Sequence, residues 1–286
     1  MRFAYGTNGF ADHRLDDALA VLADLGYDGV ALTLDGGHLD PFDADLARTV
    51  DKVAARLGEL GLSVVVETGG RYVLDPRRKH RPTLLDPPLE AARRLDLLLR
   101  AVRVAADLGA EAMSLWSGTA DPDLPEETAW RRLTEGVARV VAEAERLGVR
   151  LGFEPEPGMF IDTIAGFADL HARLGAPDAL GITLDIGHCR CLEPEPVPDC
   201  VRRAAPHLVN VQIEDMRRGV HEHLEFGEGE IDFPPVLAAL EACGYRGLVG
   251  VELPRHSHAA PEVAERSLRF LRAAAEKAGI TGEANR

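Results

Sequence analysis

Four oxygen-bearing side chains in this sequence each end a short apolar run: Glu154, Asp185, Gln212 and Glu252. The run Leu180-Gly-Ile-Thr-Leu-Asp185 is typical, because its polar residue stands where a buried strand would end. A carboxylate is costly inside a buried sheet, but at the C-terminal end of a strand it can face a shared cleft. Three carboxylates and one amide form an all-oxygen ligand set that favours a hard divalent ion. The pattern therefore predicts a metal site, with Mn²⁺ as the expected ion and Mg²⁺, Co²⁺ or Zn²⁺ as alternatives.

Three histidines lie near these proposed ligands. His188 follows Asp185 by three residues, so a turn leaving the strand would bring its ring back over the metal. His221 and His223 stand together in a long segment after the seventh expected strand. The three rings could form a second, nitrogen-rich metal site, or they could contact the substrate, and both interpretations stay open.

Further polar and aromatic residues fall beside expected strand ends or in the loops that follow them. They are candidates for substrate contacts: Glu67, Trp116, Glu156, Arg217, Arg255 and His256. Residues 77–81, Arg-Arg-Lys-His-Arg, form the one dense basic cluster in an acidic chain. This cluster is either a solvated loop face or an attractor for a phosphate or carboxylate group on the substrate.

The elements that must position these residues follow a repeating junction. Helical patterns end in Leu-Gly or Cys-Gly, and a β-rich run follows, at Gly26, Gly61, Gly109, Gly148, Gly175 and Gly244. A glycine there takes the left-handed conformation that ends a helix. We expect strands near 3–8, 28–34, 62–67, 112–116, 149–154, 180–185, 207–213 and 247–252. Eight alternating units without a linker predict an α/β protein with a single (β/α)₈ barrel as one domain over 1–286.

Helical periodicity covers the ranges 46–60, 89–108, 130–147 and 261–278. Two connections, 68–88 and 214–232, are longer than the fold needs. Both follow strand ends, and long loops on that side of a barrel usually carry function.

The composition of the chain argues against several classes of function. The chain has 286 residues, 46% of them apolar, and a formal net charge of −15. Such an acidic protein is not expected to attract nucleic acid or an anionic membrane. The absence of a long apolar run or a signal-like start predicts a cytoplasmic enzyme. Gly227-x-Gly229 matches neither nucleotide-binding fingerprint, so no nucleotide cofactor is expected.

The motifs also carry a family resemblance. Phe153-Glu154, Leu184-Asp-Ile-Gly-His188, Val211-Gln-Ile-Glu-Asp215, Phe226-Gly-Glu-Gly-Glu-Ile-Asp232 and Val251-Glu252 resemble the xylose isomerase-like barrels. This group of sugar phosphate isomerases and epimerases includes ketose 3-epimerases, hydroxypyruvate isomerases, inosose dehydratases and the endonuclease IV class. In the family the third ligand is usually histidine. Gln212 stands in that place here, as in hydroxypyruvate isomerase-like members, which implies a harder ion.

The resemblance implies a reaction as well. Glu154 and Glu252 would act as the proton-transfer pair on a sugar, sugar phosphate or cyclitol ketone, through an enediolate. The outcome is epimerisation or aldose–ketose isomerisation, with a dehydratase, other lyase or hydrolase as the alternative. Relative to the endonuclease branch, His221 replaces an aspartate, and Glu67 and Trp116 replace histidines, which argues against DNA repair. The expected partner is a small carbohydrate, neutral, phosphorylated or acidic, and a homodimer or homotetramer is compatible with the fold.

Overall fold

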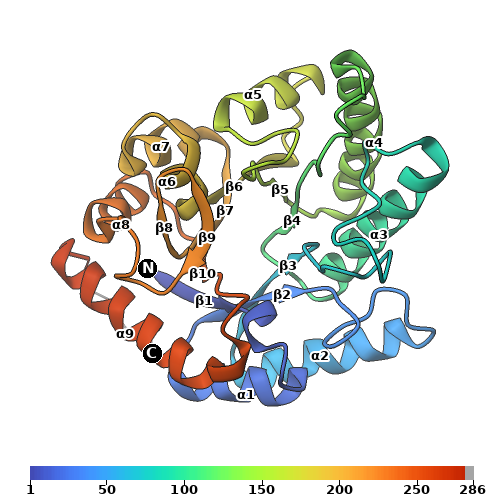
Figure 1. The fold of residues 1–286 in the computed structure, drawn as a ribbon. Coiled ribbons are helices and arrows are strands. Elements are labelled where there is room, and N and C mark those ends of the chain that lie inside the picture. Colours follow the sequence, from blue (N-terminus) through green and yellow to red (C-terminus); the bar gives the residue numbers. More distant parts are fainter. Residues whose placement is uncertain (281–286) are drawn as a thin grey trace.

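Eight parallel strands close into a barrel, and the helices form a ring outside it (Figure 1). The computed structural model describes residues 1–280. Within these residues the barrel strands are β1 (Arg2–Gly6), β2 (Gly29–Thr33), β3 (Ser63–Glu67), β4 (Met113–Leu115), β5 (Leu151–Phe153), β6 (Leu180–Asp185), β7 (Leu208–Ile213) and β10 (Leu248–Val251). Their order around the barrel is β1-β10-β7-β6-β5-β4-β3-β2. The predicted (β/α)₈ barrel is confirmed. Residues 281–286, which the one-domain expectation includes, lie outside the described residues.

The helices alternate with these strands. They are α1 (Leu15–Leu25), α2 (Leu46–Leu60), α3 (Pro88–Asp107), α4 (Glu126–Leu147), α5 (Ile164–Arg173), α6 (Ile186–Leu192), α7 (Val197–Ala204), α8 (Phe233–Ala242) and α9 (Ala260–Lys277). Short 3₁₀ turns are η1 (Thr7–Phe10), η2 (Ala205–His207) and η3 (Ser257–Ala259). The six junction glycines all have positive φ, between 61° and 88°. The predicted left-handed ends of the helices are therefore confirmed.

Apolar side chains fill both the barrel and the layer between strands and helices. Tyr5, Phe10, Phe153 and Phe167 are all buried at 2% exposure or less. The interior also has polar contacts: the Ser114 and Thr183 hydroxyls lie 3.0 Å apart. These layers fix the strands, so side chains at the strand ends are held on a rigid frame.

The structure differs from the sequence expectation in two places. The connection 214–232 was expected only as a loop, but it contains an antiparallel hairpin, β8 (Asp215–Arg217) and β9 (Val220–Leu224), that packs against α6. Helix α4 begins at Glu126 rather than at 130, because Pro125 precedes it and two glutamates occupy its first turn, where the helix dipole favours negative charge.

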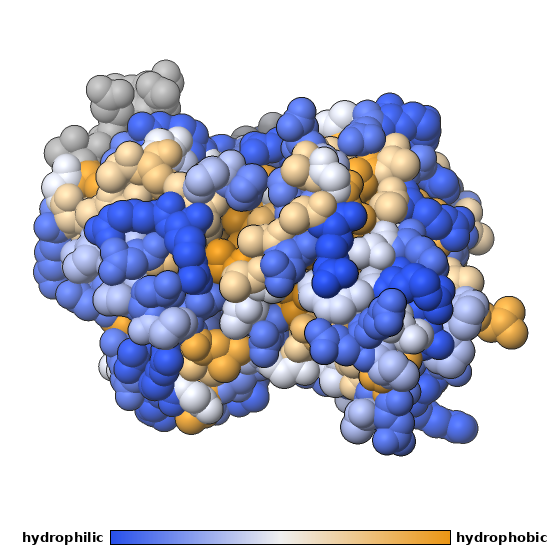
Figure 2. Space-filling view, turned by 90° about the horizontal axis from the view of Figure 1, so that it is seen from above, coloured by the Kyte–Doolittle hydropathy of each residue, from blue (hydrophilic) through white to orange (hydrophobic). Residues whose placement is uncertain are grey.

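The surface is largely hydrophilic. Figure 2 shows one side of the molecule, with hydrophilic residues over most of it and apolar residues in smaller groups between them. No helix within residues 1–280 combines the length and the apolar character that crossing a membrane requires.

Candidate metal and catalytic site

The four proposed ligands converge at the C-terminal end of the barrel. Asp185 is the last residue of β6, and Gln212 lies opposite it in the register of β6 with β7. Glu154 and Glu252 directly follow β5 and β10, which flank this pair of strands. The four proposed ligands therefore come from the ends of four consecutive strands of the barrel wall.

Asp185 is positioned by the helix that follows it. Its Oδ1 accepts a 2.7 Å hydrogen bond from the backbone N–H of His188, so the carboxylate caps the start of α6. Its Oδ2 is buried and has no hydrogen-bond partner. One oxygen is thus fixed by the fold and the other is free for a ligand.

Gln212 connects two carboxylates. Its side-chain amide donates to Glu67 Oε1 and to Glu252 Oε2, each at 3.0 Å. The other oxygen of Glu252 accepts from Asn8 Nδ2 at 3.0 Å. Because the amide nitrogen is used in this way, Gln212 Oε1 is left buried and unpaired. A single amide can therefore hold two acidic neighbours and still present an oxygen to a cation.

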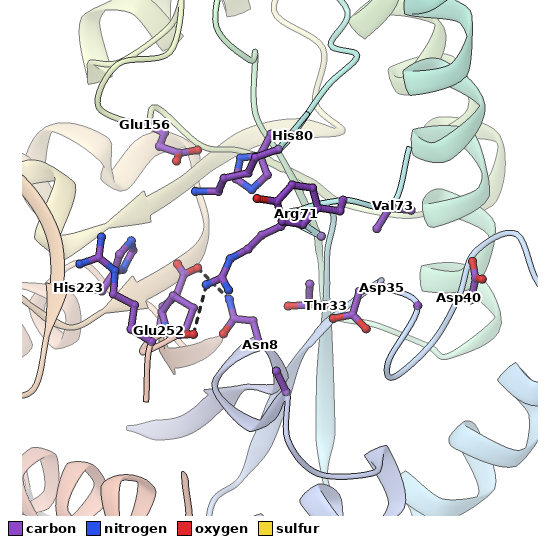
Figure 3. Close-up of a pocket in the computed structure, with 18 of the residues that line it drawn as sticks. Asn8, Thr33, Asp35, Asp40, Arg71, Val73, His80, Glu156, His223 and Glu252 are labelled. Atoms are coloured by element: carbon purple, nitrogen blue, oxygen red, sulfur yellow. Dashed lines mark hydrogen bonds between the residues drawn. The ribbon is translucent and has the colours of Figure 1, made fainter. Parts of the chain in front are cut away.

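Two cavities that share lining residues lie at this end of the barrel. An inner cavity of about 60 Å³ has walls that include Glu67, Trp116, Glu154, His188, Gln212 and Glu252. An outer cavity of about 550 Å³ is lined by residues such as Asp35, Arg71, Lys79, His221 and Arg255. Asn8, His80, Glu156, His223 and Glu252 line both cavities. Figure 3 shows Glu156 and His80 across the outer space from Glu252, whereas the side chain of Arg71 extends toward Glu252. Its Nη2 donates to the carbonyl oxygen of Pro254 at 3.2 Å.

Burial and mutual repulsion shift the acids of this site. Burial, together with the charge of Glu252, raises the pKa of Glu154 well above its usual value. Burial is the chief cause that raises the pKa of Glu252. Burial and the charge of Glu252 raise the pKa of Glu67 to about 8 and that of Glu156 to about 7. Burial also opposes the charge on Asp185, but His188 and His223 hold its pKa below the usual value. The cluster concentrates negative charge that a bound cation would offset.

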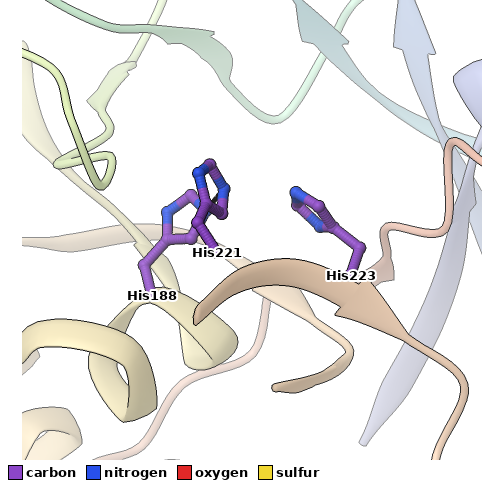
Figure 4. Close-up of side chains that lie close together, drawn as sticks. All are labelled: His188, His221 and His223. Carbon is purple, nitrogen blue, oxygen red and sulfur yellow. Dashed lines mark hydrogen bonds between the residues drawn. The ribbon is translucent and has the colours of Figure 1, made fainter. Parts of the chain in front are cut away.

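The three histidines do come together, as Figure 4 shows. His188 Nδ1 lies 3.2 Å from the Pro155 carbonyl oxygen and 3.5 Å from Glu154 Oε1, and its Nε2 faces His221 Nε2 at 3.1 Å. Burial lowers the pKa of His188 to about 3 and that of His221 to about 4. Neutral imidazoles in this arrangement can accept from a substrate hydroxyl or bind a metal.

Two of the expected contact residues lie away from the cavities. Arg217 Nη2 donates to the Glu228 carbonyl at 2.7 Å, and His256 Nε2 lies 3.9 Å from Glu225 Oε1. Neither residue lines the inner or the outer cavity. Arg217 points instead into the loop after the hairpin, because β8 turns its side chain outward.

Only some residues of the basic cluster 77–81 face the cavities. Lys79 and His80 line the outer cavity. Arg78 pairs with Asp75 and Glu90, and Arg81 pairs with Asp86 and Asp121. The cluster therefore brings one lysine, rather than a row of arginines, to the cavity.

The loop that carries His80 is held by a buried arginine that sequence reasoning missed. Arg94 of α3 donates 2.9 Å hydrogen bonds to the carbonyls of Pro82 and His80, and its guanidinium lies 4.5 Å above the Trp116 ring. Burial lowers its pKa to about 10. Nothing in the local sequence distinguishes Arg94 from the other arginines of α3.

Glu214 is a second residue that the prediction missed. It follows β7 and is completely buried, and no N–H group of residues 1–280 donates to either of its carboxylate oxygens. Burial and the neighbouring charge of Asp185 raise the pKa of Glu214 well above its usual value. Its position two residues after Gln212 is the signal that could have found it, since alternate residues of an extended segment share a side. Asn8, at the end of the first expected strand, offered a comparable signal.

Several features of the site suit a divalent cation. Asp185 Oδ2 and Gln212 Oε1 are buried acceptors without partners, and an unpaired buried acceptor costs free energy unless a donor or cation meets it. Glu154, Asp185 and His188 each offer a ligand atom within 4.8 Å of the others. Oxygen donors dominate the set, as Mn²⁺ and Mg²⁺ prefer. The residues present therefore fit a bound metal ion.

Known proteins are similar to this chain in sequence or in fold. An L-ribulose 3-epimerase from Mesorhizobium japonicum is 28% identical over 82% of this chain and 74% of that protein. An L-ribulose-5-phosphate 3-epimerase from Salmonella paratyphi C is 26% identical over 83% of this chain and 81% of that protein. The crystal structure of an IolI protein with a zinc atom has a TM-score of 0.76 at 15% identity, covering 97% of this chain and 99% of that one.

The family described as Xylose isomerase-like TIM barrel matches residues 19–274, which is most of the chain. The match spans the helices and strands that carry Glu154, Asp185, Gln212 and Glu252. The chain therefore belongs to the xylose isomerase-like TIM barrel family.

Proposed function

We propose that this protein is a divalent-metal-dependent epimerase or isomerase of a sugar or sugar phosphate. The observation that carries the proposal is that Glu154 and Glu252 line one small chamber from separate strands. Asp185 and Gln212 stand at the ends of the two strands between them. The two ribulose epimerases among its relatives support the same class of substrate.

The two glutamates would exchange protons with the substrate. One carboxylate removes the proton from the carbon next to the carbonyl, and the bonding electrons move into an enediolate. The other carboxyl group returns a proton. Return to the opposite face of the same carbon gives an epimer, and return to the neighbouring carbon gives an isomer.

Neighbouring residues keep these glutamates in place. Asn8 and Gln212 donate to the two oxygens of Glu252, so its carboxylate has a fixed orientation. Gln212 also holds Glu67, which lines the chamber. Glu154, Asp185, Gln212 and Glu252 would hold the ion, which we propose to be Mn²⁺. When bound, the ion would stabilise negative charge on the substrate oxygens.

The outer cavity would hold the rest of the substrate. Its volume of about 550 Å³ is within the usual range for small-molecule sites. Lys79, Arg71 and Arg255 give it positive groups, while Asp35 and Asp40 give it negative ones. Both a neutral sugar, bound through hydroxyls, and a phosphorylated one, bound through Lys79 and Arg71, are compatible with this wall.

A substrate panel tests the proposal. The Mn²⁺-loaded protein is incubated with L-ribulose, L-ribulose 5-phosphate, ketohexoses and cyclitol ketones, and the products are identified by NMR. We expect an epimer or aldose isomer from at least one ketose. Loss of water from a cyclitol ketone, with no ketose turned over, would replace the isomerase assignment by a dehydratase.

A further inference from the structure

The loop between β3 and α3 carries a strained residue at the boundary of the two cavities. His80 has a backbone φ of 61°, in the left-handed region that residues other than glycine rarely adopt. Such a conformation persists only where the surrounding structure holds it, and it is common at ligand sites. The proposed reaction gives His80 no role, although its side chain lines both the inner and the outer cavity.

Neighbouring groups fix both the backbone and the ring of His80. Its N–H donates to the Arg71 carbonyl oxygen at 2.6 Å, and its carbonyl oxygen accepts from Arg94 Nη2 at 2.9 Å. The imidazole lies beside the Trp116 ring, with the two centroids 5.2 Å apart and the planes inclined by 37°. The fold therefore sets the direction of this ring through its backbone and through its contact with Trp116.

The imidazole of His80 has an unused hydrogen-bonding atom. Its Nε2 is buried and has no hydrogen-bond partner among residues 1–280, and an unpaired buried polar atom costs free energy until a partner meets it. Burial, together with the charges of Lys79 and two arginines, lowers the pKa of His80 to about 3. The ring is therefore neutral near neutral pH. A neutral imidazole can donate to or accept from a hydroxyl, but it offers no charge to a phosphate.

The position of His80 indicates which part of a substrate it would meet. His80 lies across the outer space from Glu252 (Figure 3). The inner cavity, at about 60 Å³, is far smaller than the roughly 300–1,000 Å³ of a typical small-molecule site. A sugar whose reacting carbon is within reach of Glu252 must therefore extend into the outer cavity. The first hydroxyl beyond the reacting carbon would fall at the boundary that His80 lines.

We propose that His80 determines substrate specificity by hydrogen-bonding the hydroxyl on the carbon that follows the reacting carbon, on the side away from the carbonyl. In L-ribulose undergoing 3-epimerisation, this group is the 4-hydroxyl. His80 thereby selects ketoses with a free hydroxyl at this position over sugars that lack it or carry a phosphate there. The role rests on the proposed function, because it concerns the same site.

A pair of sugars tests the role of His80. L-ribulose and its 4-deoxy analogue are compared, by kcat/KM and by calorimetric binding, in the Mn²⁺-loaded wild type and in His80→Phe, which keeps an aromatic ring without a hydrogen-bonding atom. We expect the preference for L-ribulose to be about fivefold greater in the wild type, the effect of one neutral hydrogen bond. His80→Gly, in which a positive φ is unstrained, should show the same loss. The control is His258→Phe, whose exposed side chain lines neither cavity and which should keep the wild-type preference.

Turnover distinguishes a failure of this role from a failure of the proposed function. If the substrate panel identifies another ketose, that sugar and its analogue without the corresponding hydroxyl are used, and thermal unfolding shows which variants are folded. An unchanged preference in a folded His80→Phe or His80→Gly that still turns over the ketose would overturn the role of His80 alone. A preference that depends on His80 in binding, without turnover of any ketose, would overturn the proposed function alone. A protein that binds no ketose would overturn both.

Discussion

At the scale of single residues, Gln212 explains how so many acids share one chamber. It donates to both Glu67 and Glu252, so two carboxylates that would repel each other meet at one amide. The family resemblance indicates histidine as the usual third ligand. A neutral histidine has one ring N–H, whereas the amide has two N–H donors and an oxygen acceptor. Glutamine therefore suits a site in which the neighbouring acids must also be held.

The proton-transfer role of Glu154 and Glu252 gives a prediction at this scale. Glu154→Gln and Glu252→Gln should each lower kcat by about 10²–10⁴-fold, since an amide cannot exchange a proton with the substrate. The measurement is steady-state turnover of the ketose that the panel identifies, together with thermal unfolding of each variant.

The control for this pair is Glu145→Gln, an exposed glutamate of α4 that should leave turnover unchanged. Because both glutamates are also proposed metal ligands, bound metal is counted in each variant. Near-normal turnover in either variant would remove that residue from the proton-transfer pair.

At the scale of elements, the loop between β3 and α3 depends on one buried cation. Arg94 bonds the carbonyls of Pro82 and His80 and lies over Trp116, so the loop and the chamber wall meet at its guanidinium. His80, which lines both cavities, is also 5.2 Å from the Trp116 ring centroid. The helix therefore sets the position of a cavity wall that it does not itself form.

Removing the Arg94 guanidinium should weaken substrate binding more than it slows the chemical step. Arg94→Met keeps much of the volume but leaves the loop carbonyls without their donor, which should cost on the order of 2–4 kcal/mol of unfolding free energy. We expect KM to rise several-fold while kcat changes less. Chemical denaturation and steady-state kinetics check both, with Arg103→Met on the surface of α3 as the control. A fall in kcat at constant KM would contradict the positioning role.

The positions of the strands and helices can be compared with those that the sequence predicts. All barrel strands begin and end within two residues of the predicted ranges, because apolar runs and left-handed glycines are local signals. The β8–β9 hairpin was not predicted, since its residues are polar and its order depends on distant contacts. Asp215 accepts backbone hydrogen bonds from Gly227 and Ile231, and a Cβ on Gly229 would lie 2.2 Å from its Oδ1. The glycines after Phe226 thus allow close packing around Asp215.

The candidate site likewise has features that the sequence predicts and features that it does not. Ligands at strand ends could be read from the sequence, because a parallel barrel brings all of those ends to one face. The burial of Glu214, the donors on Glu252 and the outward direction of Arg217 depend on side-chain packing between segments far apart in the chain. No sequence pattern encodes those contacts.

At the scale of the whole molecule, an already acidic protein has a cluster of acidic residues at one end of its barrel. The net charge is −15, and buried carboxylates with raised pKa values meet around a chamber of about 60 Å³. Ionising all of them without a cation would oppose folding. A divalent ion bound here should therefore stabilise the entire barrel.

Metal removal should lower thermal stability. A ligand present at about 100 times its Kd adds about 2.7 kcal/mol to the free energy of unfolding. We expect Mn²⁺ to raise Tm by several degrees over the chelated protein, and to have little effect on Asp185→Asn, which lacks one of the proposed ligand carboxylates. Scanning calorimetry in matched buffers makes the comparison. An equal rise in both proteins would assign the stabilisation to sites elsewhere.

The most direct test of the account follows a single hydrogen. The Mn²⁺-loaded protein is incubated with L-ribulose, its 5-phosphate and related ketoses in deuterated water, and NMR monitors the carbon next to the carbonyl. The account predicts that solvent deuterium enters at this carbon as the epimer or isomer forms, and that Glu154→Gln and Glu252→Gln abolish the exchange. Full retention of hydrogen in every sugar shown by calorimetry to bind would contradict it.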